Sequence, residues 1–196
     1  MIQAVTKGLG GAGQGAVVTA IMGNADTQLE LFLVPATSDF PFQTVFTVGL
    51  SRCAVSSQRR LFAELMMHLP FTWDLGHRFF QAPEYQWPIE WLRKTAAAII
   101  DRSLVIPGKH VIIANDDPPK PLGAGTEQSC LLLLADFYDF SPVKVADGKE
   151  VHLYQMVPLY AEERDFERER GILPLLNAMA RIPGSLAVHP DRERFV

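Results

Sequence analysis

Hydrophobic residues at every second position mark the N-terminal half of the chain as β-structure. Leu29, Leu31 and Leu33 share one side of the segment 28–34, which is the period of a strand with one buried face. A β-branched run at 16–22 precedes it, and the turn-forming residues between the two segments predict a hairpin. We therefore expect two paired strands at the start of the folded region.

The segment 60–69 carries two conflicting signals. It contains good helix formers such as Glu64 and Met66. Apolar side chains nevertheless also recur there with period two, on a face made of Leu61, Ala63, Leu65, Met67 and Leu69. Because the alternation extends over the whole segment, we predict a strand rather than a helix.

Short apolar runs and periodic stripes predict the remaining elements. Strands are expected at 43–51, 110–114, 129–135, 143–146 and 151–157, the last two joined by a turn at Asp147 and Gly148. Helices are expected at 88–102, beginning at Pro88, at 159–168 and at 172–182. A long exposed loop is expected at 115–125, and a polar tail at 183–196.

These elements predict an α+β fold, in which helices flank a mixed, mostly antiparallel central sheet. The strands at 43–51, 110–114 and 129–135 are expected in the middle of that sheet, because the last of them is apolar on both faces. A flexible glycine-rich leader, residues 1–15, would precede a single domain that spans residues 16–196.

Composition and charge exclude some classes of function. The chain has 196 residues, of which 48% are hydrophobic, and a net charge of −4. That charge disfavours nucleic acid as a partner, since affinity for phosphates comes from clustered Lys and Arg. No apolar run has the length of a membrane span, and the N-terminus lacks a signal-peptide pattern, so we expect a cytoplasmic protein. Cys53 and Cys130 are then expected to be reduced thiols.

A dense charged segment follows residue 160. Its acidic members Glu162, Glu163 and Asp165 alternate with arginines, a composition typical of a solvated helix face and, as the second interpretation, of a partner-binding face. A pair of carboxylates can also perform acid–base chemistry where burial separates their pKa values. Nothing in this polar run indicates burial.

Other candidates for chemistry are weak. The five histidines have no metal-ligand spacing, although His68, His110 and His152 each fall on a predicted strand. Cys53 at the end of a predicted strand could serve as a nucleophile beside a histidine, but no enzyme signature surrounds it. We therefore predict no catalytic residue, no metal and no cofactor. A small cytoplasmic enzyme that uses Cys53 or a carboxylate pair is the alternative.

Several short motifs, in this order and spacing, resemble the suppressor of fused family in its single-domain bacterial form. They are Thr47-x-Gly49-x-Ser51, Glu64-Leu65, Leu69-Pro70, Pro107-Gly108-Lys109-His110-Val111, Pro158-Leu159-Tyr160 with Glu162-Glu163, and Gly171-Ile172-Leu173 with Leu175-Leu176. The match runs from about residue 28 to the end of the chain. Lys109 stands where the animal members carry an acidic residue.

The resemblance implies a protein-binding domain without catalysis. Animal members resemble this chain only in their first domain, and the peptide of their transcription-factor partner lies between that domain and a second one, so this role is not transferred. Bacterial members resemble immunity proteins, which bind and neutralise polymorphic toxins. An acidic chain would suit a basic toxin, by electrostatic complementarity. A regulatory or scaffold role in the cytoplasm is a further alternative.

The predicted partner-binding surface combines the 115–125 loop with the acidic segment. The loop is stiffened by prolines and would lose little entropy on binding, and an aromatic side chain beside charges is common at interfaces. The residues assigned to this surface are Asp116, Asp117, Tyr160, Glu162, Glu163 and Asp165. The sequence carries no indication of an oligomeric state.

Overall fold

The structure is a computed structural model, and it describes residues 3, 20–22, 29–56, 61–75, 82–137, 139 and 141–196. Nearly all of the predicted leader, residues 1–15, and the turn of the first predicted hairpin lie outside the described residues. The strands, helices and contacts of the fold are those of these residues.

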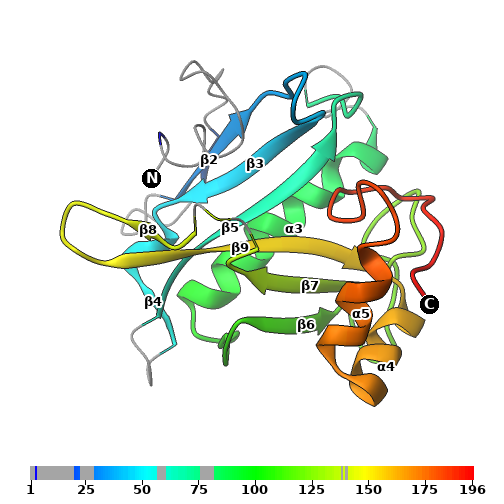
Figure 1. The fold of residues 1–196 in the computed structure, drawn as a ribbon. Coiled ribbons are helices and arrows are strands. Elements are labelled where there is room, and N and C mark those ends of the chain that lie inside the picture. Colours follow the sequence, from blue (N-terminus) through cyan, green and yellow to red (C-terminus); the bar gives the residue numbers. More distant parts are fainter. Residues whose placement is uncertain are drawn as a thin grey trace.

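One twisted sheet organises the molecule (Figure 1). Its main path follows the order β1-β2-β3-β5-β9-β7-β6, and β4 and β8 pair with β5 and β9. The strands are β1 (Ala20–Met22), β2 (Leu29–Val34), β3 (Phe42–Val48), β4 (Ala54–Ser56), β5 (Leu61–Pro70), β6 (His110–Ala114), β7 (Cys130–Ala135), β8 (Val143–Lys144) and β9 (Glu150–Leu159). All pairs are antiparallel except β5 with β9. The predicted α+β class with a mixed, mostly antiparallel sheet is therefore confirmed.

The segment 60–69 is a strand, as the alternation predicts: β5 lies in the middle of the sheet between β3 and β9. The prediction that 110–114 is central is wrong, because β6 forms an edge of the sheet. Its apolar side chains pack on both faces of the sheet: Val111 and Ile113 contact one core cluster and Ile112 another. Two apolar faces therefore do not distinguish an edge strand from a central one.

The third predicted strand, 43–51, ends earlier than expected. β3 stops at Val48, and Gly49 follows with φ 114°, a conformation that favours glycine. A short 3₁₀ helix, η1 (Leu50–Arg52), then leads into β4. The turn brings together the backbone N–H groups of Gly49, Leu50 and Ser51.

The long helix α3 (Pro83–Ile100) begins five residues before the predicted start at Pro88. Pro83 occupies the first turn, where its missing N–H costs no helical bond. Pro88 lies inside the helix and is buried. The hydrogen bond that Pro88 cannot donate is near the helix start, so the helix continues through it.

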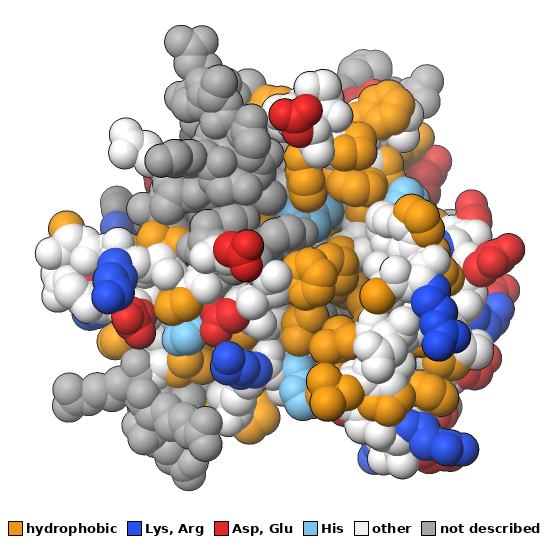
Figure 2. Space-filling view, in the orientation of Figure 1, with side chains coloured by type: hydrophobic (Ala, Val, Ile, Leu, Met, Phe, Trp, Pro, Cys, Tyr) orange, Lys and Arg blue, Asp and Glu red, His pale blue; other side chains and the backbone are white. Residues whose placement is uncertain are grey.

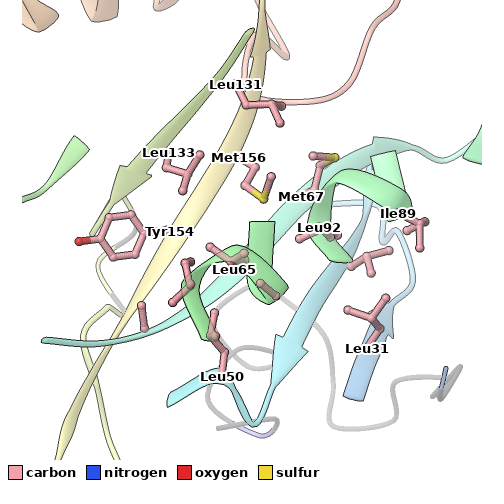
Figure 3. Packing of buried hydrophobic residues seen from close by; sticks show 14 of the residues in the cluster. Leu31, Leu50, Leu65, Met67, Ile89, Leu92, Leu131, Leu133, Tyr154 and Met156 are labelled. Atoms are coloured by element: carbon pink, nitrogen blue, oxygen red, sulfur yellow. The ribbon is translucent and has the colours of Figure 1, made fainter. Parts of the chain in front are cut away.

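Helix α3 covers one face of the sheet, and α4 (Ala161–Arg170) and α5 (Ile172–Met179) cover part of the other face (Figure 1). Leu92 and Ile89 of α3 point into the main core, against Leu65 and Met67 of β5 and Met156 of β9 (Figure 3). On the opposite face, α5 contributes Leu175 and Met179 to a cluster with β7 and β9. The C-terminal helices thus lie near the β6 edge of the sheet.

The C-terminal segment, residues 184–196, is not the solvated polar tail that its composition predicts. Ala187 and Val188 are buried, with 2% and 0% of their surface exposed. Ala187 bridges His68 of β5 in parallel orientation, and the Val188 N–H donates to the His68 carbonyl at 2.8 Å. On the β9 side, the Gln155 side-chain amide donates to the Leu186 carbonyl at 3.0 Å. The segment therefore packs against the sheet between β5 and β9.

Candidate binding surfaces

The acidic segment after residue 160 is only partly a solvated face, because Glu163 is completely buried. It occupies the first turn of α4, where its carboxylate accepts a hydrogen bond from the Tyr160 N–H at 2.9 Å. The Arg192 guanidinium binds both carboxylate oxygens at 2.6 Å, and the Phe195 N–H donates at 2.7 Å. Four donors thus compensate for the loss of water around this charge.

Tyr160 and Arg192 are parts of the same buried assembly. Tyr160 is 4% exposed, and its hydroxyl donates to the Arg192 carbonyl at 2.8 Å. The Arg192 guanidinium lies over the Phe195 ring, 3.6 Å from its centre, and donates to the Pro158 carbonyl at 2.9 Å. Tyr160 and Glu163 therefore fasten the C-terminal segment to α4, and the expectation that they are exposed for a partner is wrong.

Glu162 and Asp165 are exposed on another side of α4. With Glu169 they form one wall of a hollow of about 870 Å³ between α4, α5 and the C-terminal segment, which we call the α4–α5 hollow. Phe166, Pro174, Ala178 and Phe195 give the hollow an apolar part, and Arg181 is the only cation that lines it. Asp165 also accepts hydrogen bonds from Arg164, and Glu162 lies 3.7 Å from Arg194, so in the described part of the chain Glu169 is the acidic residue of this wall without an ion pair.

Asp116 and Asp117 border a different depression, of about 400 Å³, which we call the β6 groove. It runs along β6 and is walled by the α4 residues Arg164, Glu167 and Arg168. Charged side chains of both signs gather at the lower right of the face shown in Figure 2, where the C-terminal helices lie, whereas hydrophobic side chains cover the middle of the sheet. The structure thus places the two predicted acidic groups in separate depressions on either side of α4.

A second buried carboxylate explains the Thr47-x-Gly49-x-Ser51 motif. Glu64 of β5 is 0% exposed and accepts hydrogen bonds from the hydroxyls of Thr47 and Ser51, both at 2.7 Å. The N–H groups of Gly49, Leu50 and Ser51 donate to it at 3.0 to 3.3 Å. Burial raises the pKa of Glu64, and these donors oppose that rise. The motif binds a buried carboxylate, and its partner Glu64 belongs to the Glu64-Leu65 motif and is an acidic residue within an apolar strand.

The three histidines of the predicted strands do not come together. His152 of β9 is paired with Ala63, His68 lies further along β5, and His110 is on the sheet edge. His77 lies outside the described residues. Within the described part of the chain, no group of three or more His, Cys, Asp or Glu side chains could hold a metal ion.

An acid–histidine pair is present near the β7–β8 connection. His152 Nδ1 lies 2.8 Å from Asp136, and the Ser141 hydroxyl donates to the same carboxylate at 2.7 Å. In a nucleophilic triad the histidine stands between the acid and the hydroxyl. Here the hydroxyl binds the acid directly, so this arrangement joins two segments rather than activating a serine. Cys53 is half-buried at the end of η1.

No helix in the described ranges is long and apolar enough to cross a lipid bilayer.

A family profile and several solved structures agree on the family that this chain is similar to. The profile of the suppressor of fused protein (SUFU) family matches residues 25–193. No sequence among curated proteins matches the chain. Among solved structures, a SUFU homologue from Neisseria gonorrhoeae is similar with a TM-score of 0.63 and 13% identity, over 100% of this chain and 94% of its own.

Two further solved structures have the same fold. A chain of the Sufu–Fu complex matches with a TM-score of 0.63 and 15% identity, over 98% of this chain and 88% of its own. Drosophila Suppressor of Fused matches with a TM-score of 0.64 and 14% identity, over 98% of this chain. The match covers 49% of the Drosophila chain, so the present chain spans about half of that protein.

Proposed function

Because the chain belongs to the suppressor of fused family, we propose that it is a protein-binding domain without catalytic activity. We further propose that its partner is a basic toxin domain, which it binds and neutralises as an immunity protein. The Sufu–Fu complex supports the first statement, since a protein of the same fold is bound there to another protein. The second statement is supported by the resemblance to bacterial single-domain members and by the net charge of −4.

The observation that carries the proposal is the acidic α4–α5 hollow. Glu162, Asp165 and Glu169 recur at helical spacing on one side of α4, beside the apolar surface of Phe166 and Phe195. Such a site suits lysine or arginine side chains, whose aliphatic stems need apolar contacts and whose charged ends need carboxylates. Asp116 and Asp117 lie outside this surface.

Two alternatives have weaker support. An enzyme that uses a carboxylate pair would need two acids facing each other, but Glu64 and Glu163 are each saturated by donors of the protein itself. A regulatory or scaffold protein would use the same hollow on a different partner. The identity of the partner distinguishes a regulatory or scaffold role from the role of an immunity protein.

A binding measurement with the genetic neighbour tests the proposal. The probe is the C-terminal domain of a large secreted protein encoded beside this chain. We expect a complex at submicromolar concentration and loss of the toxin's activity in it. The variant Glu162→Lys/Asp165→Lys/Glu169→Lys should associate at least about tenfold more slowly, and its association rate should depend less on salt.

The control is Glu90→Lys/Asp101→Lys, which changes two exposed carboxylates of α3 and its C-terminus, away from the hollow. It is compared with the double variant Glu162→Lys/Asp165→Lys, which changes the net charge by the same amount. The control should bind nearly as the native chain does. Equal slowing by both variants would mean that overall charge, not the hollow, steers association. Absence of any complex at ten micromolar would contradict the immunity proposal. The proposal of a protein-binding domain would then be tested with other protein partners, through the same hollow.

A further inference from the structure

The outer edge of β6 exposes backbone groups that are ready to pair with another strand. In the antiparallel ladder with β7, Ala135 N–H binds the Lys109 carbonyl and Asn115 N–H binds the Ser129 carbonyl. Hydrogen-bonded and non-bonded pairs alternate along such a ladder. The N–H and C=O groups of His110, Ile112 and Ala114 therefore point away from β7.

The residues of β6 themselves provide none of the usual protection against pairing, although the α4 side chains Arg164, Glu167 and Arg168 line the groove beside the strand. Natural edge strands are commonly blunted by an inward charge, a proline or a bulge. The sequence of β6 is His-Val-Ile-Ile-Ala, its register with β7 is regular, and all five residues are partly or fully exposed. No strand in the described part of the chain pairs with its outer side.

The charges at the two ends of β6 are opposite. Lys109 precedes the strand, and Arg168 lies on the same end of the groove, because its neighbour Glu167 contacts His110 at 3.4 Å. Asp116 and Asp117 follow the strand at the other end. Among the described residues, Lys109 and Arg168 have no ion-pair partner within their own chain, whereas Asp116 pairs with Lys120 and Asp117 lies in the field of Arg164.

We propose that β6 pairs with β6 of a second copy of this chain, antiparallel and centred on Ile112. A two-fold axis there places His110 opposite Ala114 of the other copy and forms about six backbone hydrogen bonds. The same symmetry brings Lys109 and Arg168 of each copy to Asp116 and Asp117 of the other. The two sheets then form one continuous sheet.

The dimer is compatible with binding of a different partner. The residues of α4 that wall the β6 groove, Arg164, Glu167 and Arg168, differ from those that line the α4–α5 hollow, although Arg164 hydrogen-bonds Asp165 at 2.7 Å. The α4–α5 hollow therefore stays accessible in both copies. The inference does not depend on the proposed function.

Sedimentation velocity of the purified chain tests the inference directly. We expect a concentration-dependent dimer of twice 21.8 kDa at micromolar concentrations. Ala114→Pro removes an outward N–H without touching the ladder to β7, and edge strands tolerate proline at such a position. It should therefore stay folded and weaken the dimer at least about tenfold, whereas Ala114→Val, which keeps the N–H, should not.

A charge exchange gives a second test that does not alter the backbone. Asp117→Lys and Arg168→Glu each create like-charge contacts at both ends of the homodimer, so each variant alone should sediment as a monomer. Mixed together, they restore one native pair and one reversed pair, and a heterodimer should form.

Hydrogen exchange separates this interface from others. The amides of His110, Ile112 and Ala114 should exchange more slowly as the concentration of chain rises. A chain that stays monomeric up to half-millimolar concentration would overturn the inference. So would a dimer that Ala114→Pro leaves intact, or single charge variants that dimerise as well as their mixture.

Discussion

The Glu163 carboxylate is buried and yet fully hydrogen-bonded, because the start of a helix and a distant arginine meet at it. Its side chain is 0% exposed and that of Arg192 is 5% exposed. Removing one partner of a buried pair leaves an uncompensated charge, which is more costly than the net contribution of the pair itself. The stability of the C-terminal segment should therefore be sensitive to either residue.

We predict that Arg192→Met lowers the free energy of unfolding by about 3–5 kcal/mol, as measured by urea denaturation. Glu162→Gln, which changes the adjacent but exposed carboxylate, should change it by less than about 0.5 kcal/mol. The double variant Glu163→Gln/Arg192→Met should lose less than the sum of the single losses, because the second change removes the unpaired charge. Strict additivity would show that the pair is not coupled.

The burial of Glu163 could be inferred only in part from the sequence. A glutamate three residues after a helix N-cap often binds back to the backbone, so its contact with Tyr160 has a local signal. Arg192 stands 29 residues further on, in a segment whose composition is that of a polar tail. Contacts between distant segments have no periodicity, and for this reason the predicted surface wrongly included Tyr160 and Glu163 as exposed residues.

Local sequence patterns are sufficient to predict whether an element is a helix or a strand. They are not sufficient to predict where it begins and ends, or which strands it pairs with. The period-two alternation at 60–69 outweighed its helix formers, because burial of a face contributes more than intrinsic propensity. The sequence predicts the start of α3 at Pro88 because proline favours a first turn, but Pro83 fulfils the same condition. The edge position of β6 has no signal in the sequence, because its apolar side chains pack against core clusters on both faces of the sheet.

The packing of the 115–125 loop against α3 can be tested at Gly123, which lies against Trp87. A Cβ added to Gly123 would lie within 2.5 Å of both the Cβ and the Cγ of Trp87, and rotation of the side chain cannot move that Cβ. We predict that Gly123→Ala destabilises the protein by about 1–3 kcal/mol in thermal or urea unfolding. Gly108→Ala is the matched control, since its Cβ would meet no atom within 4 Å. Equal stability of the two variants would contradict this packing.

For the whole molecule, the class of fold followed from the sequence and the strand order did not. Hairpins such as β8–β9 carry turn signals, whereas the parallel pairing of β5 with β9 joins segments with no local relation. The motifs shared with the suppressor of fused family have a structural role that local patterns do not show. They include Thr47, Gly49 and Ser51, whose common role is to bind Glu64.

Stability as a function of pH is a property of the whole molecule that one buried side chain should influence strongly. Burial lowers the pKa of His68 to about 3, from an ordinary value of 6.5. Between these values the unfolded chain binds more protons than the folded one, so stability rises with pH and is lost on acidification. We predict a contribution of up to about 1.4 kcal/mol per pH unit in this window.

Urea unfolding at several pH values between 4 and 7.5 measures this slope. His68→Gln should reduce it. Thr44→Val removes the 2.7 Å hydrogen bond to the histidine ring but leaves the ring buried, so it should lower stability while keeping the slope. An unchanged slope in His68→Gln would mean that His68 is not the titrating group.

The parallel β5–β9 pair has a consequence for how fast the chain folds. Phe62 is paired with Val151, so the middle of the sheet closes only when segments about ninety residues apart meet. The entropy of closing such a loop is lost before the contacts form, and chains dominated by distant contacts fold in milliseconds to seconds. The meander β2–β3–β5 can form earlier from neighbouring segments. Until β9 arrives, β5 would present a bare apolar edge, and this interval is when the chain is most exposed to aggregation.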